Sequence, residues 1–111
     1  MQTSRSVAIT FAEIAADAAR SVPGVLDLDA GSAGTFATIT PGRRIPGVRV
    51  HHADRRRVSI RVVAAYGAPL AHLANSVRAV VSQRLSELGP PVPDVDVIIA
   101  DLHTDEGIGD S

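Results

Sequence analysis

The stretch that decides the fold is VSIRVVAAYGAPLAHLANSVRAVVSQRL, residues 58–85. Residues 58–65 alternate between two faces, and this period of two predicts a strand. From Leu70 onward the apolar residues recur at helical spacing instead, and Pro69 suits the first turn of a helix. The apolar stripe consists of Leu70, Leu73, Val77, Val80, Val81, Leu85 and Leu88. We therefore expect a strand that reverses at Tyr66-Gly67, with Tyr66 anchoring the turn through its ring and hydroxyl, into a helix that covers it.

Two further strands are predicted around this unit. Residues 48–52 alternate like residues 58–65, and the charged turn 54–57 would join the two runs into a hairpin. Residues 95–102 form another aliphatic run after the helix, which Gly89-Pro90-Pro91 should end. A strand, a helix and a returning strand favour a right-handed crossover, so residues 95–102 should lie parallel to residues 58–65.

The N-terminal third predicts a second helix. Thr10 and Glu13 have the spacing of a capping box, and Pro23-Gly24 would end a helix that begins there. Short strands are expected at residues 25–28 and 35–40, and PGRRIPG, residues 41–47, is predicted to be a loop. The fold class is thus α+β, a two-layer sandwich in which two helices cover one face of a mixed β-sheet.

Length and composition indicate one domain over residues 1–111, with 1–6 and 104–111 as flexible tails. The chain has no cysteine, which excludes a disulfide framework, thiolate metal sites and a cysteine nucleophile. No apolar stretch approaches the roughly 20 residues that cross a bilayer, and the N-terminus lacks the pattern of a signal peptide. We expect a cytoplasmic protein without a transmembrane segment, whose membrane contact is peripheral or made through a partner.

Positive charge gathers in the middle of the chain, where Arg55, Arg56 and Arg57 lie in the predicted hairpin. Such a cluster could contact an anion, a lipid headgroup or nucleic acid. Asp94 and Asp96 are expected beside Arg57 in a parallel sheet and would balance part of this charge. The hairpin lacks aromatic side chains on which bases could stack, which disfavours binding of single strands.

The search for chemistry gives no catalytic, cofactor or metal site. His51 and His52 are adjacent on a strand, so their side chains point to opposite faces, and a cluster of either one with His103 and Asp101 is the remaining metal alternative. Neither Ser59 nor Ser82 lies in a nucleophile elbow. The stretch 42–47 lacks the ending of a phosphate-binding loop and precedes a strand.

The sheet face away from the helices is the predicted interaction surface. Alternation places both charged and apolar side chains there, a mixture that suits a self-complementary interface. The predicted face comprises Arg49, His51, Ser59, Arg61, Val63, Asp96, Ile98 and Ala100, of which Arg49, His51, Arg61, Val63, Asp96 and Ile98 are the candidate contact residues.

Several stretches together resemble a known family. These are ITFAEIAADAARSVPGVLDL (9–28), RIPGVRV (44–50), VSIRVVAAYG (58–67) and VDVIIADLHTD (95–105). In this order they are similar to the bacterial alkaline shock protein family, also called the envelope stress response family. Tyr66-Gly67 followed by the helix is the most characteristic piece, and the resemblance covers nearly the whole chain.

The resemblance implies a non-enzymatic scaffold of the cell-envelope stress response that needs no cofactor. It also implies a homo-oligomer that gathers at the inner face of the membrane by docking to a membrane-anchored protein. Two other classes stay open: a small nucleic-acid-binding module that uses the Arg-rich hairpin, and an accessory domain of iron and sulfur metabolism. The lack of cysteine disfavours the last, because cluster chemistry needs thiolates.

Overall fold

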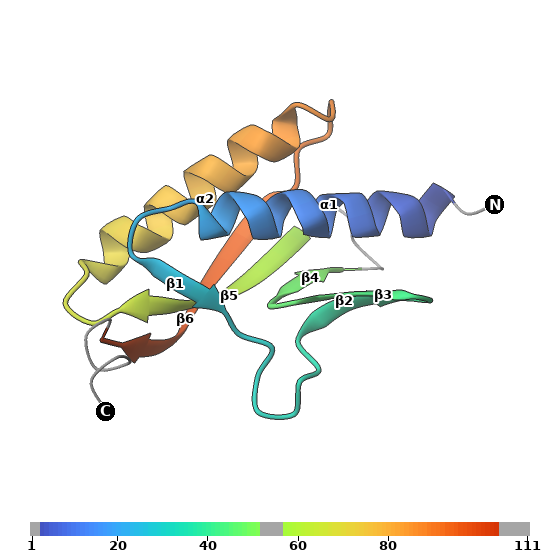
Figure 1. Ribbon diagram of the computed structural model, residues 1–111. Coiled ribbons are helices and arrows are strands. Elements are labelled where there is room, and N and C mark those ends of the chain that lie inside the picture. Colours follow the sequence, from blue (N-terminus) through green and yellow to red (C-terminus); the bar gives the residue numbers. More distant parts are fainter. Residues whose placement is uncertain (1–2, 52–56, 105–111) are drawn as a thin grey trace.

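A computed structural model describes residues 3–51 and 57–104, the side chains of residues 3–6 excepted. Figure 1 shows the helices packed over a twisted sheet, with a short hairpin beside it. In chain order the elements are α1 (Thr3–Arg20), β1 (Val25–Leu28), β2 (Ala37–Thr40), β3 (Arg43–Pro46), β4 (Val48–Val50), β5 (Arg57–Ala65), α2 (Leu70–Ser86) and β6 (Asp94–His103). The α+β class predicted from the sequence is confirmed.

Strand β5 is the centre of a four-stranded mixed sheet. β6 runs parallel to β5 along its whole length, while β1 and β4 are antiparallel to it. Because β6 occupies one edge of β5, β1 and β4 share the other edge, beside residues 62–64 and 58–60 respectively. The predicted pairing of β4 with β5 and the parallel return of β6 are both confirmed.

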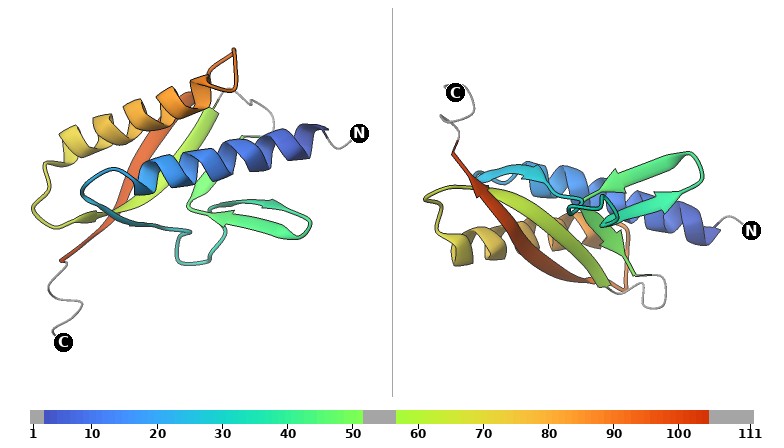
Figure 2. Two further views of the ribbon diagram at one scale, coloured as in Figure 1. Left: turned by 45° about the horizontal axis from the view of Figure 1, so that its top comes forward. Right: turned by 90° about the horizontal axis from the view of Figure 1, so that it is seen from below.

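Both helices lie on the same face of this sheet, as the two views of Figure 2 show. The side chains that β5 turns toward them are fully buried, because Val58, Ile60, Val62 and Ala64 each have 0% exposure. Helix α2 completes this core with its buried side chains, which are Leu73, Val77, Val81 and Leu85. The alternation read from residues 58–65 therefore predicted the core face correctly, whereas Leu70 and Leu88, at the two ends of the predicted helical stripe, are exposed.

Helix α1 begins at Thr3, so the prediction that Thr10 caps it is wrong. Residues 3–9 contain no glycine or proline to stop the helix, and Ala8 extends the buried face by a further turn. Glu13 forms no capping box, because its carboxylate pairs with Arg43 of β3. The buried face of α1 is rich in alanine (Ala8, Ala12, Ala15, Ala16, Ala18, Ala19), which lets the helix lie close to its neighbours.

Residues 41–47 are not a plain loop, which corrects the sequence prediction. β2 and β3 pair as an antiparallel two-stranded sheet, in which Ile39 lies opposite Arg44. The buried Thr38 joins this hairpin to the main sheet: its hydroxyl donates to the Val48 carbonyl (2.7 Å) and accepts from the Val50 amide (3.3 Å). A side chain thus satisfies backbone groups at the edge of β4, which local sequence patterns do not reveal.

The turn from β5 to α2 depends on Gly67, whose φ of 93° lies in the left-handed region. The prediction that Tyr66 anchors this turn through its ring and hydroxyl is wrong. That side chain is 71% exposed, and the backbone amide of Tyr66 instead donates to the His103 carbonyl at 2.7 Å. This bond ties the turn to the end of β6.

Candidate interaction surface

The face of the sheet opposite the helices, called here the open face, carries the residues predicted for contact. In the register, Ser59 lies opposite Arg49 of β4 and Asp96 of β6, and Arg61 lies opposite Ile98. Side chains that are directly opposite each other in a sheet share a face. The structure therefore brings the predicted contact residues of three strands together.

A β-bulge changes the prediction at the end of β6. Val62 pairs with Ile99 but Val63 pairs with Asp101, so Ala100 is the extra residue. The bulge reverses the alternation beyond it. Asp101 and His103, which lie opposite Val63 and Ala65, therefore continue the open face, and Ala100, which was predicted for that face, has no partner on β5.

Ion pairs neutralise much of the charge on this face. The Arg61 guanidinium contacts the Asp29 carboxylate at 2.9 Å, and both side chains are only about one-third exposed or less. Arg57 contacts Asp96, also at 2.9 Å, which bears out the expectation that the start of β6 balances this arginine. In these pairs the positive charge of each arginine is balanced by a carboxylate, so the open face does not carry a strongly positive electrostatic potential.

A loop covers the β4 side of the face. The ring of Phe36 lies 4.6 Å from the Arg49 guanidinium and 5.6 Å from that of Arg61, within cation–π range. Arg49 also donates to the Thr35 carbonyl at 3.2 Å. Sequence reasoning missed both Phe36 and Asp29, because nothing local indicates that residues 29–36 fold back across β4 and β5.

The apolar part of the open face is exposed mainly on β6. Val63 is 8% exposed and already covered within the chain, whereas Ile98 is 38% exposed. The outer edge of β6 carries no strand partner among the described residues, although Arg78 of α2 donates to the Val95 carbonyl at 3.2 Å. Ile98 is therefore the apolar contact that this face offers to another molecule.

Two histidines of this face are engaged by neighbouring side chains. His51 Nε2 lies 2.9 Å from Ser59 Oγ, and His103 Nε2 lies 3.1 Å from the Asp101 carboxylate. Hydrogen bonds from the Leu102 amide and from His103 hold the pKa of Asp101 below its usual range. Within residues 3–51 and 57–104, no group of three or more potential ligands could hold a metal ion. His52 lies outside the described residues.

The Arg-rich hairpin is described only in part. Arg57 is the first residue of β5, while Arg55 and Arg56 lie outside the described residues. The prediction that this turn contacts an anion therefore remains a prediction, as does the binding of nucleic acid there.

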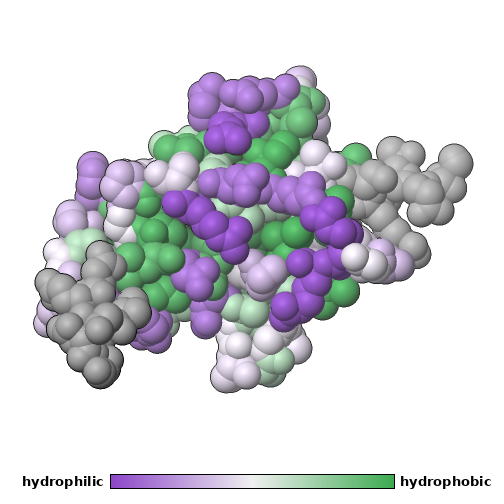
Figure 3. Space-filling model, viewed as in Figure 1, coloured by the Kyte–Doolittle hydropathy of each residue, from purple (hydrophilic) through white to green (hydrophobic). Residues whose placement is uncertain are grey.

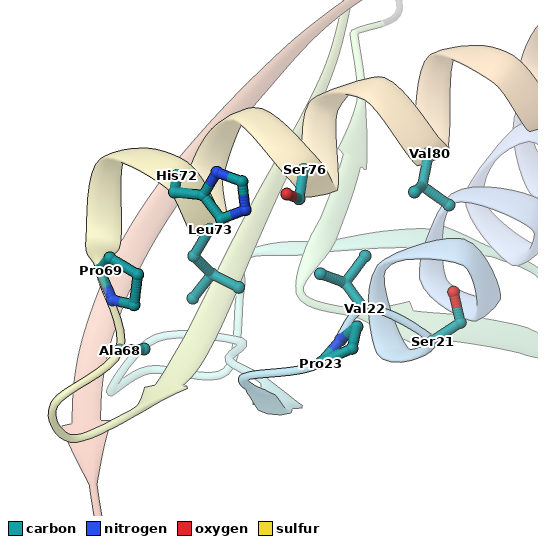
Figure 4. A pocket seen from close by; sticks show the side chains of 9 residues that line it. All are labelled: Ser21, Val22, Pro23, Ala68, Pro69, His72, Leu73, Ser76 and Val80. Carbon is teal, nitrogen blue, oxygen red and sulfur yellow. The ribbon is translucent and has the colours of Figure 1, made fainter.

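A groove of about 410 Å³ separates the end of α1 from the start of α2. Its apolar walls include Val22, Pro23 and Leu73, and Figure 4 shows Val22 and Leu73 on its two sides. In Figure 3 a strip of hydrophobic surface lies between the hydrophilic atoms along the two helices. His72 and Ser76 supply polar groups at this groove.

Comparison with known protein families matches residues 4–104 to the model of the alkaline shock protein family, which is described as having a cell envelope-related function. The chain belongs to the alkaline shock protein family. The resemblance read from the sequence is thereby confirmed. No curated protein and no solved structure gave a match to this chain. Among residues 3–51 and 57–104 of the chain, no helix is long and apolar enough to cross a lipid bilayer.

Proposed function

We propose that this member of the alkaline shock protein family is a non-enzymatic interaction protein of the cell-envelope stress response, which self-associates and docks to a membrane-anchored partner from the cytoplasmic side. The observation that carries the proposal is Ile98, an exposed apolar side chain on the open face. Around it the charges are paired within the chain, as in Arg57–Asp96 and Arg61–Asp29. Burying Ile98 would therefore gain hydrophobic free energy without stripping water from an unpaired charge.

The burial and hydrogen bonding of the potential catalytic side chains also favour a binding role over a catalytic one. Ser59 is 6% exposed and lies on the sheet with His51 as its hydrogen-bond partner, away from the groove between the helices. A serine nucleophile needs an accessible hydroxyl beside oxyanion donors. The nucleic-acid alternative has less support, because Phe36, the aromatic ring of the open face, already stacks on Arg49 and Arg61.

The test is sedimentation velocity of the wild-type chain and of Ile98→Asp over a range of concentrations. We expect the wild type to associate as concentration rises and Ile98→Asp to stay monomeric, because the new carboxylate would be buried unpaired. Ile39→Asp is the matched control, since Ile39 is also exposed (58%) but lies on the β2–β3 hairpin. Val63 is too buried for this test, since a charge there would unfold the chain.

Circular dichroism of each variant would confirm that the fold is intact. A wild type that remains monomeric at every concentration would remove the self-association proposal. Association of Ile98→Asp equal to that of the wild type would show that another surface is used.

A further inference from the structure

The β2–β3 hairpin has two different faces. Its inner face holds Thr38, which bonds to β4, and Arg43, whose guanidinium pairs with Glu13 of α1. Its outer face holds Ile39 and Arg44, which lie directly opposite each other in the register. Ile39 is 58% exposed, and Arg44 is exposed as well. An exposed aliphatic side chain therefore sits beside a guanidinium group.

The hairpin extends away from the four-stranded sheet, and the views in Figure 2 show it at the margin of the molecule. The pair of Arg43 with Glu13 and the two bonds of Thr38 hold it in place from the inner side. Residues 41–42, which connect the two strands of the hairpin, are exposed, and Pro41 lies close to Ile39 in the sequence. Because the hairpin is held in place and protrudes, its exposed apolar side chain can touch a flat partner surface that the recessed parts of the molecule cannot reach.

The positive charge continues beyond the hairpin. Arg44 donates to the Gly34 carbonyl and Arg49 to the Thr35 carbonyl, so two guanidinium groups bind neighbouring residues of the same loop. A guanidinium has five N–H donors, and one such bond leaves others available to phosphate oxygens. Clustered arginine beside exposed aliphatic surface is the combination that binds anionic membrane interfaces.

We propose that the outer face of the β2–β3 hairpin contacts the surface of an anionic phospholipid bilayer directly. Ile39 enters the boundary between headgroups and acyl chains, and Arg44 binds headgroup phosphates. A bilayer suits this surface because the hydrogen bond of Arg44 goes to a carbonyl and not to a carboxylate, whereas the arginines Arg57 and Arg61 of the open face pair with Asp96 and Asp29. The contact is separate from the Ile98 surface, so it adds a second, lipid-based attachment to the partner-based docking proposed above.

The experiment is co-sedimentation of the purified chain with vesicles of phosphatidylglycerol mixed with phosphatidylcholine, and with vesicles of phosphatidylcholine alone. We expect binding to the anionic vesicles that weakens as salt is raised. Ile39→Ser and Arg44→Gln should each lower the apparent affinity about fivefold. Two matched controls should bind like the wild type: Ile98→Ser, an exposed isoleucine on β6, and Arg84→Gln, an equal loss of charge on α2.

Equal binding to both kinds of vesicle, or none, would overturn the proposal. A loss with Arg84→Gln as large as that with Arg44→Gln would also overturn it, because binding would then follow net charge and not the hairpin. Binding of a short RNA, reduced by Arg44→Gln, without any vesicle binding would assign the surface to nucleic acid instead. The vesicles carry no partner protein and Ile98→Ser removes the proposed association surface, so failure here is distinct from failure of the scaffold proposal.

Discussion

Ile60→Ala is expected to lower the free energy of unfolding by about 3–4 kcal/mol. Ile60 has 0% exposure at the middle of β5, between Val48 of β4 and Val97 of β6, and faces the helices. Truncation removes buried methyl groups and leaves a cavity that three paired strands cannot close. For a domain of this size that is a large share of its stability. Urea denaturation followed by circular dichroism measures the change.

The matched control is Ile39→Ala, the same chemical change at an exposed position of β2. It should alter the unfolding free energy by about 0.5 kcal/mol or less. Equal effects of the two substitutions would contradict the assignment of the core to the helix-facing side of β5.

Gly47→Ala is expected to cost about 3 kcal/mol, because two effects add at this position. Gly47 has a φ of 80°, a conformation that is unfavourable for residues with a side chain by about 1–2 kcal/mol. A Cβ there would also lie 2.6 Å from Cβ of Leu28 and 3.0 Å from the Asp29 amide nitrogen. The backbone cannot move aside easily, since the Gly47 amide donates to the Phe36 carbonyl and its carbonyl accepts from the Arg61 amide. Thermal or urea unfolding gives the value.

Gly42→Ala separates the two effects. Gly42 has a similar φ of 82°, but no atom lies within 4 Å of the added Cβ. Only the conformational part should remain, about 1 kcal/mol. If both alanine variants lose the same stability, the close approach between residues 28–29 and Gly47 does not constrain the fold as the structure indicates.

The sequence predicted those parts of the fold in which local pattern and burial agree. Strand β5 alternates and helix α2 repeats at helical spacing, and each buries most of the side chains that its own pattern selects, such as Ile60 and Val77. Helix α1 was placed correctly at its C-terminal end, where Pro23-Gly24 is a strong stop signal. Its start was missed, because a Thr-x-x-Glu pattern indicates a helix terminus only when no helix-forming residues precede it.

The errors lie where distant contacts override local signals. Pro41, Gly42, Pro46 and Gly47 indicate a loop, yet β3 forms because β2 pairs with it and Thr38 fixes the hairpin to β4. The bulge at Ala100 has no signature in an unbroken aliphatic run.

The same distinction holds for the candidate surface. The pair of Arg57 with Asp96 followed from the parallel register, and it was predictable once β6 was placed. The covering of Arg49 and Arg61 by Phe36 was not, because it depends on the path of the loop over residues 29–36. Loop conformation is set by contacts with the folded scaffold and not by local propensity.

The most direct measurement of the central proposal is a concentration series of backbone amide NMR spectra of the wild-type chain. If the open face is the association surface, the signals that move with concentration should belong to β6 around Ile98 and to the facing residues Ser59 and Arg61, while those lining the groove between α1 and α2 stay in place. Shifts confined to the groove, or spectra that do not change with concentration, would contradict it.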